Sequence, residues 1–361
     1  MPDMCAARLA GMQGFALAPR GRTAKKDVLN ANRCAMSIPT FADVEAAAAR
    51  IAPYAVRTPL LENAELNARA GGRVFLKPEP LQRTGSFKFR GAVNTVLQIP
   101  ADKRAGGVVA FSSGNHAQGV AAAAAAFGLP ATIVMPKDAP EGKIAGTRRL
   151  GAAIVFYDRL TEDREAIARE IVARTGATLI QPFDNAMVVA GQGTVGLEIA
   201  ADVRARGMTL DAVVTPCGGG GLLTGIALAL SGAATKTIGI EPERFDGMRR
   251  SLAAGERTTA PGGELSIADA LMAPAPGHIP FALATDRVAA VHTISDSELE
   301  RAVAFAFLRL KIVVEPGGAA ALAAVLAGKI DTKDKVIAVV LSGGNVDIAT
   351  VVRCCSAVTD P

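Results

Sequence analysis

The chain of 361 residues is long enough to bury a sizeable core and to fold as two domains or lobes. Half of its residues are hydrophobic and a fifth are charged, as in ordinary globular proteins, and no uninterrupted apolar run is long enough to span a bilayer. The net charge of +5 does not indicate a nucleic-acid partner, because +4 of it falls in residues 1–35 and the chain has no Trp and only two Tyr.

The first 35 residues show no strong periodicity. Their basic, acid-poor composition is shared by transit peptides, but they lack the apolar region of a secretory signal. Met36, followed by SIPTFADVEAAAARIAPYAVRTPL, has the character of a natural start. We therefore interpret residues 1–35 as a disordered extension or as the product of a start codon assigned too far upstream.

Alternation of strands and helices dominates the chain from about residue 40. Residues 41–54 have helical spacing, with Thr40 as the expected N-cap for a first turn that contains Glu45. Seven β-rich apolar runs follow, most of them succeeded by a helical stretch: 106–111, 131–136, 152–157, 177–183, 211–216, 236–242 and 335–341. This pattern predicts an α/β protein with parallel sheets covered by helices on both faces.

Residues 254–292 form the longest irregular region. Their Pro and Gly content predicts a loop-rich excursion, which we expect to lie over an active site. The five cysteines are odd in number and have no zinc-like spacing, which predicts reduced thiols in a cytoplasmic protein. The five cysteines are Cys5, Cys34, Cys217, Cys354 and Cys355.

Three polar or glycine-rich stretches directly follow predicted strands. They are SSGNHAQG (112–119), CGGGGLLTG (217–225) and SGGNVD (342–347). Ligands of open α/β sheets bind outside the carboxyl ends of the strands. We therefore expect the three stretches to line one crevice.

The run Gly218–Gly221 suits an anion, because glycines let backbone N–H groups approach it and the next helix points its positive end at the same place. Taken alone, the run is equally well explained as a tight turn. Lys88 in TGSFKFRGA is a lysine in an apolar setting, where burial lowers the pKa and frees the neutral amine, although a surface lysine beside a turn is the simpler explanation. A phosphate site and such a lysine together indicate pyridoxal phosphate.

The chain from about residue 38 to 354 resembles the threonine/serine dehydratases and serine racemases, which are pyridoxal-phosphate enzymes of the tryptophan-synthase-β-like fold (fold type II). LQRTGSFKFRGA, SSGNHAQG, AGQGT, GGGGLLTG, EPGGA and LSGGNVD occur in the family's order. The resemblance implies two doubly wound parallel-sheet lobes with the cofactor in the cleft between them. Residues 36–105 plus 186–361 would form the large lobe, and residues 106–185 the small inserted one.

The resemblance also implies roles for residues around the cofactor. Lys88 would form the Schiff base and act as the Cα base, with Phe87 against the cofactor ring. Asn115 would hydrogen-bond the 3′ oxygen, although it also suits a turn. Ser342 would meet the pyridine nitrogen, a hydroxyl that favours β-elimination over transamination, or would merely cap a helix. The phosphate would be bound by Gly218, Gly219, Gly220, Gly221 and Leu222.

The substrate carboxylate would be surrounded by one loop, which comprises Ser112, Ser113, Gly114, Asn115 and His116. Ser113 lies where serine racemases keep the acid–base group on the face opposite the lysine. His116 is expected in a hydrogen-bonded supporting position rather than in proton transfer. Arg164 would reach the carboxylate when the small lobe closes, or would be a solvated arginine on a helix face.

A cation site is a further candidate from the resemblance. IEPERFDG (240–247) is similar to a stretch that holds a divalent cation in several family members. Glu241 fits the pattern, but Gly247 stands where the pattern ends in an aspartate, and Asp246 lies one place earlier. A shifted ligand, a lost site or a monovalent ion are the alternatives. Glu315 would be structural or near the cation.

The activity implied is that of an L-threonine/L-serine dehydratase, a lyase that yields 2-oxobutyrate or pyruvate and ammonia by β-elimination. Only fourteen residues follow SGGNVD, so we expect no regulatory domain and a catabolic role. The family implies a homodimer, a hydroxy amino acid substrate, and neither nucleic acid nor membrane as partner. Serine racemase and threo-3-hydroxyaspartate ammonia-lyase are the close alternatives, and a non-catalytic cofactor-binding module is the alternative from another class.

Overall fold

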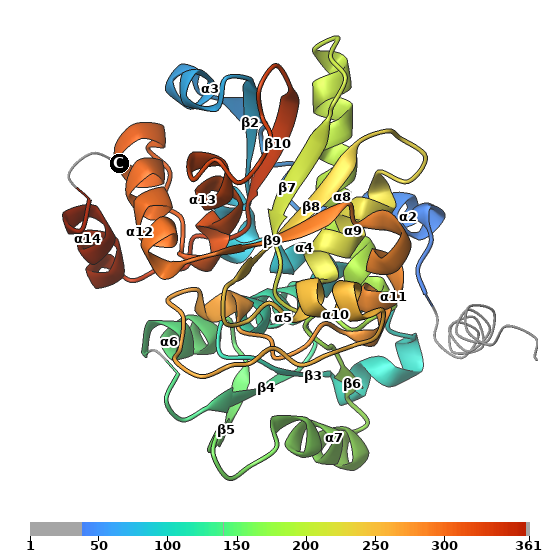
Figure 1. The fold of residues 1–361 in the computed structure, drawn as a ribbon. Coiled ribbons are helices and arrows are strands. Elements are labelled where there is room, and N and C mark those ends of the chain that lie inside the picture. The colour runs from blue at the N-terminus through green and yellow to red at the C-terminus, as the bar shows by residue number, and fades with distance from the viewer. Residues whose placement is uncertain (1–37, 140, 359–361) are drawn as a thin grey trace, which may run out of the picture. The chain divides into compact units, whose positions relative to one another are not determined.

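The computed structural model of the chain describes residues 38–139 and 141–358 (Figure 1). The extension predicted for residues 1–35 lies outside the described residues, as do Cys5 and Cys34. Cys217, Cys354 and Cys355 are free thiols, in agreement with the expectation for these three.

Two sheets organise the described chain (Figure 1). The first has the strand order β1-β2-β10-β7-β8-β9 and is parallel except for the antiparallel β1–β2 pair at its edge. The second, of order β5-β4-β3-β6, is parallel throughout. The strands are β1 (Leu61–Glu62), β2 (Arg73–Pro78), β3 (Val108–Phe111), β4 (Ala131–Pro136), β5 (Ala153–Tyr157), β6 (Thr178–Leu179), β7 (Ala212–Pro216), β8 (Lys236–Pro242), β9 (Ala290–Ile294) and β10 (Val336–Leu341).

Helices cover both faces of each sheet, as the alternating pattern predicts. Buried side chains of α12 and α13 pack on one face of the six-stranded sheet, and those of α8 and α9 pack on the other. On the four-stranded sheet, α4 and α5 cover one face and α7 the other. The helices are α2 (Phe41–Ile51), α3 (Ala64–Ala70), α4 (Lys88–Val96), α5 (Asn115–Ala126), α6 (Glu141–Arg149), α7 (Arg164–Thr175), α8 (Ala186–Ala205), α9 (Gly221–Ala229), α10 (Gly247–Ala254), α11 (His278–Arg287), α12 (Asp296–Phe305), α13 (Ala320–Leu326) and α14 (Ile348–Ser356).

All seven predicted strands are present. Six have the same or slightly different ends, whereas the run 177–183 forms only the two-residue strand β6. The lobe boundaries at residues 105 and 185 stay a prediction, because the contacts of residues 38–361 cluster as one unit. Thr40 caps α2 as expected, and Asp43 completes a capping box with it.

The irregular region 254–292 is only partly irregular. It contains the short 3₁₀ helix η4 (Asp269–Leu271), then α11, and it ends in the first residues of β9. The prediction failed for its second half because Pro280, which looks like a helix breaker in the sequence, sits in the first turn of α11. A proline is tolerated there because the first-turn N–H groups lack partners within the helix.

Helix α8 is long and apolar enough to cross a membrane by length and composition, although Glu198 and Asp202 interrupt its apolar sequence. However, 61% of its apolar window is buried inside the protein. It packs against α4 and α9 (Figure 1). We therefore interpret α8 as a core helix.

A network of buried charges joins α4 to its surroundings. Arg90 on α4 is fully buried and donates to both oxygens of Glu79 at 2.8 Å. It also donates to Glu198 on α8 at 2.6 and 2.9 Å. Lys77 of β2, also fully buried, donates to Glu198 at 2.7 Å and to the carbonyl of Thr58 at 2.6 Å. The two cations Arg90 and Lys77 thus balance the two anions Glu79 and Glu198 inside the protein. Arg90 lies two residues after Lys88 on α4, so the network is close to the lysine in the chain.

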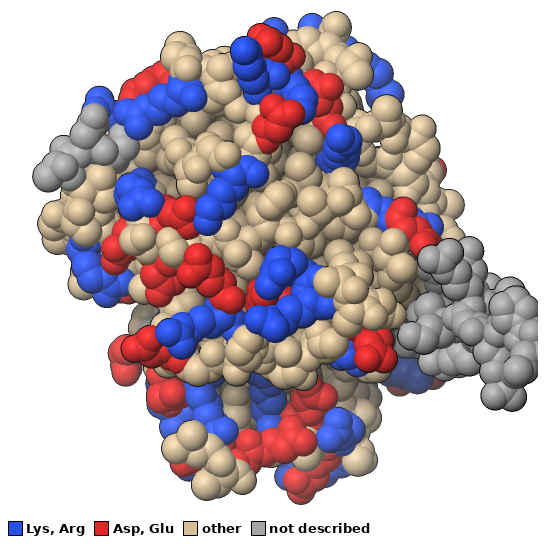
Figure 2. All heavy atoms as spheres, in the orientation of Figure 1, with Lys and Arg blue, Asp and Glu red and all other residues tan. Residues whose placement is uncertain are grey.

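The surface charges are mixed. Figure 2 shows Lys and Arg interspersed with Asp and Glu over the face in view, without one basic stripe. This distribution matches the near-neutral charge of the chain beyond residue 35. It gives no support for a nucleic-acid surface on that face.

Candidate active site

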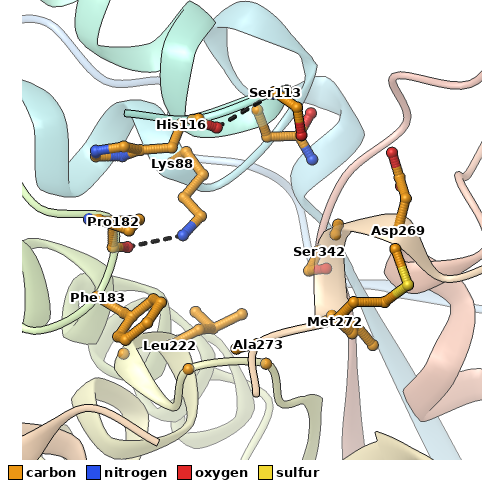
Figure 3. A pocket seen from close by; sticks show the side chains of 18 of the residues that line it. Lys88, Ser113, His116, Pro182, Phe183, Leu222, Asp269, Met272, Ala273 and Ser342 are labelled. Carbon is orange, nitrogen blue, oxygen red and sulfur yellow. Dashed lines mark hydrogen bonds between the residues drawn. The ribbon is translucent and has the colours of Figure 1, made fainter. Parts of the chain in front are cut away.

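The three stretches that follow β3, β7 and β10 meet at one pocket, as predicted (Figure 3). Each lies at the carboxyl end of its strand, so the two sheets both contribute to the walls. The pocket brings together every residue that the sequence assigned to cofactor and substrate: Phe87, Lys88, Ser112, Ser113, Gly114, Asn115, His116, Arg164, Gly218, Gly219, Gly220, Gly221, Leu222 and Ser342. Glu241 and Asp246 are not among the lining residues.

Lys88 is the first residue of α4, and the turn before it fixes its place. Thr84 and Gly85 have positive φ angles of 62° and 73°, which reverse the chain just ahead of the helix. The backbone N–H of Phe87 donates to the carbonyl of Ser342 at 3.2 Å, and Ser86 bridges to Gly343. These contacts hold Lys88 beside the carboxyl end of β10.

The Lys88 amine points into the pocket (Figure 3). Its Nζ donates to the carbonyl of Pro182 at 2.8 Å and lies 5.1 Å from the centre of the Phe87 ring. Burial lowers the pKa of Lys88 to about 8, against a smaller opposing effect of Glu315. Near neutral pH, a much larger fraction of this amine is therefore unprotonated than for a surface lysine.

The glycine loop, Gly218–Gly221, connects β7 to the N-terminus of α9. Gly220 has a φ of 94°, which favours glycine. At Gly219 a Cβ atom would lie 2.3 Å from the ring of Phe183, and at Gly221 it would lie 3.1 Å from the Cβ of Phe183. Glycine is thus required at Gly219 by a close neighbour, and all four residues of the loop line the pocket.

Replacement of Gly219 by alanine should weaken binding of pyridoxal phosphate. Overpacking of this kind costs about 1–3 kcal/mol, so we expect the dissociation constant to rise about 5- to 150-fold in an equilibrium titration. Gly142→Ala is a matched control, because nothing lies within 4 Å of a Cβ there. Adding Phe183→Ala to the Gly219→Ala variant should restore affinity. Unchanged affinity in Gly219→Ala would show that the loop does not hold the phosphate.

Asn115 begins α5 and is held on both sides of its amide. Its Nδ2 donates to Glu315, and its Oδ1 accepts from Asn345 at 2.8 Å. The pKa of Glu315 is raised to about 7 by burial and then by Asp269. The structure thus places Glu315 against Asn115, where it orients the amide at the pocket wall.

His116 lines the pocket and is hydrogen-bonded to the backbone behind it. Its Nε2–H group donates a hydrogen bond of 2.8 Å to the carbonyl oxygen of Ile180. Burial, and then the nearby Lys88, lowers the pKa of His116 to about 3. A histidine that stays neutral at ordinary pH does not deliver a proton as imidazolium.

The serine loop, Ser112–Asn115, leads from β3 into α5, so the first N–H groups of that helix face the pocket. The backbone N–H of Gly114 donates to the Ser112 hydroxyl at 3.1 Å. Arg164, the first residue of α7, stacks over the Phe111 ring at 5.2 Å and also lines the pocket. Helix N–H groups and a guanidinium are suitable partners for a carboxylate.

The structure does not support the expected cation at Glu241 and Asp246. Asp246 forms ion pairs with Arg249 and Arg250, so its charge is already balanced. Glu241 accepts the N–H groups of Met248 and Arg249, both at 2.9 Å. Within residues 38–139 and 141–358, no group of three or more His, Cys, Asp or Glu side chains is arranged to hold a metal ion.

Several residues that line the pocket were not predicted from the sequence, and three of them matter for its chemistry or shape. Phe183 lies beyond the short strand β6, Lys143 lies on α6, and Asp269 lies in η4. Phe183 and Lys143 belong to no motif that the sequence brought out. Asp269 falls in the excursion expected over an active site, and this was the one available signal.

Comparisons with known proteins agree with this geometry. The sequence model of a family described as "Pyridoxal-phosphate dependent enzyme" matches residues 51–343. The chain is 43% identical over 317 residues to L-threo-3-hydroxyaspartate ammonia-lyase of Saccharomyces cerevisiae, covering 87% of this chain and 95% of that protein. It is 42% identical over 313 residues to serine racemase of Schizosaccharomyces pombe, covering 86% and 95%. The crystal structure of a threonine deaminase from T.th. has a TM-score of 0.80 at 44% identity, covering 86% of this chain and 99% of that one.

Proposed function

The chain belongs to the pyridoxal-phosphate dependent enzyme family, and we propose that it is an ammonia-lyase that eliminates water from 3-hydroxy amino acids, including L-serine and L-threonine. Two of the similar proteins named above are an ammonia-lyase and a deaminase of such amino acids. The observation that carries the proposal is a lysine of lowered pKa that shares one pocket with a glycine loop at a helix N-terminus.

The pocket residues fit pyridoxal phosphate. The glycine loop and the N-terminus of α9 present N–H groups where only glycine is sterically allowed at Gly219, which suits the phosphate. The Lys88 amine would join the aldehyde, Phe87 would contact the ring, and Asn115 would offer its oriented amide to the ring oxygen. Ser342, which is 5% exposed, offers a neutral hydroxyl rather than a carboxylate at the ring nitrogen. When bound, this cofactor withdraws electrons from the Cα atom of an amino acid.

Lys88 is the residue that we propose removes the Cα proton. Its lowered pKa makes the neutral amine available as a base near neutral pH. The serine loop and Arg164 would hold the substrate carboxylate and so orient the Cα–H bond toward that amine. Loss of the Cα proton and of the β-hydroxyl as water leaves an enamine, which takes up water outside the pocket to give a 2-oxo acid and ammonia.

Racemisation is a second candidate, favoured by Ser113. Inversion at Cα needs one group that removes the proton and another that returns it from the opposite face. Ser113, in the serine loop after β3, and Lys88, on α4, both border the same pocket (Figure 3). The serine hydroxyl would return the proton in such a reaction.

Release of 2-oxo acid from L-serine, L-threonine and L-threo-3-hydroxyaspartate tests the proposal directly. We expect pyruvate from serine and 2-oxobutyrate from threonine, each with an equal amount of ammonia. Chiral chromatography of the remaining amino acid measures racemisation in the same samples. The absence of 2-oxo acid and ammonia with all three substrates would contradict the proposed elimination, and D-serine without ammonia would favour the racemase.

A further inference from the structure

An ion pair crosses the wall of the pocket between two segments that are distant in the chain. The Nζ of Lys143, on α6, pairs with the carboxylate of Asp269, in η4. Both residues line the pocket. The Lys143 side chain is only 15% exposed, whereas that of Asp269 is 41% exposed. The cation is therefore held within the wall, and its partner reaches it from the solvent side.

The Lys143 ammonium lies against the serine loop. A Cβ atom at Gly114 would be 3.5 Å from both the Nζ and the Cδ of Lys143. A substrate whose carboxylate is held by the serine loop would therefore lie close to this ammonium. Lys143 is thus placed to contact the substrate.

The substrate's own α-carboxylate does not need Lys143. The serine loop already offers the first N–H groups of α5 and two serine hydroxyls, and Arg164 borders the same pocket. Besides Lys88, the charged residues that line the pocket in the described chain are Lys143, Arg164 and Asp269. If Arg164 is assigned to the α-carboxylate, Lys143 is a second cation in the pocket. In the structure the Asp269 carboxylate neutralises Lys143.

We propose that Lys143 binds the distal carboxylate of a 3-hydroxy dicarboxylic amino acid, and that Asp269 occupies the same place when this substrate is absent. The inference rests on the proposed elimination and names its preferred substrate class. The distal carboxylate of 3-hydroxyaspartate has the same chemistry as the Asp269 side chain, so one ion pair replaces another. Asp269 returns to water on its exposed turn, whereas serine and threonine have no charge with which to displace it.

Two substitutions separate this role from a structural one, because their effects should be opposite. In Lys143→Gln the ratio of KM for L-threo-3-hydroxyaspartate to KM for L-serine should rise about tenfold, as for loss of one charged hydrogen bond. In Asp269→Asn the same ratio should fall several-fold, because the competing carboxylate is gone. Lys137→Gln removes an exposed lysine and is the control for net charge; it should leave the ratio unchanged.

Binding without turnover provides a second measurement. Succinate and butyrate have the same chain length but carry two carboxylates and one, respectively. The inhibition constant of succinate against L-serine should rise in Lys143→Gln and fall in Asp269→Asn. The inhibition constant of butyrate should be the same in both variants as in the wild-type enzyme. The increase in melting temperature caused by succinate, measured without any amino acid substrate, should be smallest in Lys143→Gln and largest in Asp269→Asn.

The outcomes distinguish the two proposals. No ammonia from any amino acid would overturn the proposed elimination, and succinate binding would still test Lys143. If elimination proceeds but both substitutions shift the KM values for serine and hydroxyaspartate by equal factors, Lys143 and Asp269 act only as a structural link between α6 and η4. That result would overturn the inference about the substrate and leave the elimination intact.

Discussion

Replacing Lys88 by alanine should lower the rate of 2-oxo acid release from L-serine by about a thousandfold or more. We assign the Lys88 amine both to joining the cofactor and to removing the Cα proton. Each of these roles raises the catalytic rate by orders of magnitude. Its lowered pKa and its contact with Pro182 depend on this position, so no neighbouring lysine replaces it. Steady-state measurement of 2-oxo acid release, at saturating pyridoxal phosphate, checks the result.

Lys103→Ala is the matched control for this experiment, because Lys103 is exposed in the 3₁₀ helix Ala101–Gly106. It should keep the wild-type rate. Borohydride treatment of the loaded wild-type enzyme should fix the cofactor covalently on the peptide that contains Lys88, and the same treatment of Lys88→Ala should not. A Lys88→Ala enzyme that retains more than a tenth of the wild-type rate would remove Lys88 from the catalytic role.

Replacing Arg90 by methionine should lower the free energy of unfolding by about 3–5 kcal/mol, the usual cost of breaking a buried ion pair. Arg90 faces two carboxylates, Glu79 and Glu198, and the substitution leaves Glu79 without its cationic partner inside the protein. Methionine fills most of the volume of the arginine side chain, so the loss of stability comes from the missing charge and not from a cavity. Urea unfolding followed by circular dichroism measures it.

An exposed ion pair provides the comparison for Arg90. Arg159 pairs with Asp138, and their side chains are 42% and 66% exposed. Water already solvates both charges, so Arg159→Met should cost less than about 1 kcal/mol. Equal losses in the two variants would mean that the buried network contributes no more than a surface pair.

The regular part of the fold was predictable from local patterns. Parallel strands that are buried on both faces appear in the sequence as solid apolar runs, and all seven such runs became strands. Three strands of the described chain were missed. β1 has only two residues, Arg73 and Lys77 lie within the short apolar run of β2, and His292 and the preceding loop-rich region obscure β9. The strand character of β2 and β9 comes from pairing with β10 and β8, which local sequence does not reveal.

The candidate site was predictable where its chemistry is local. A phosphate loop needs consecutive glycines, and a helix N-terminus must follow directly, so Gly218–Gly221 is recognisable without coordinates. Phe183 and Lys143 have no such signature. Their importance arises from contacts with Gly219 and with Asp269, respectively, and these contacts join segments that are 36 and 126 residues apart.

The cation site at Glu241 and Asp246 stays a prediction from a local pattern, and the structure does not support it. Glu241 and Asp246 have spacing close to that of a ligand set, but spacing does not show which partners reach them first. In the fold, Arg249 and Arg250 lie one turn beyond Asp246 on α10, and the backbone of the same helix satisfies Glu241.

The sequence by itself determined the α/β class, the three loops at the strand ends, and the lysine and glycines that suit pyridoxal phosphate. These features depend on backbone geometry and on residues that are adjacent in the chain. Only the tertiary structure decided the lowered pKa of Lys88, the neutral state of His116 and the pairing of Lys143 with Asp269. Burial and charge pairing depend on distances between residues remote in sequence, and those distances exist only after the sheets and helices have packed.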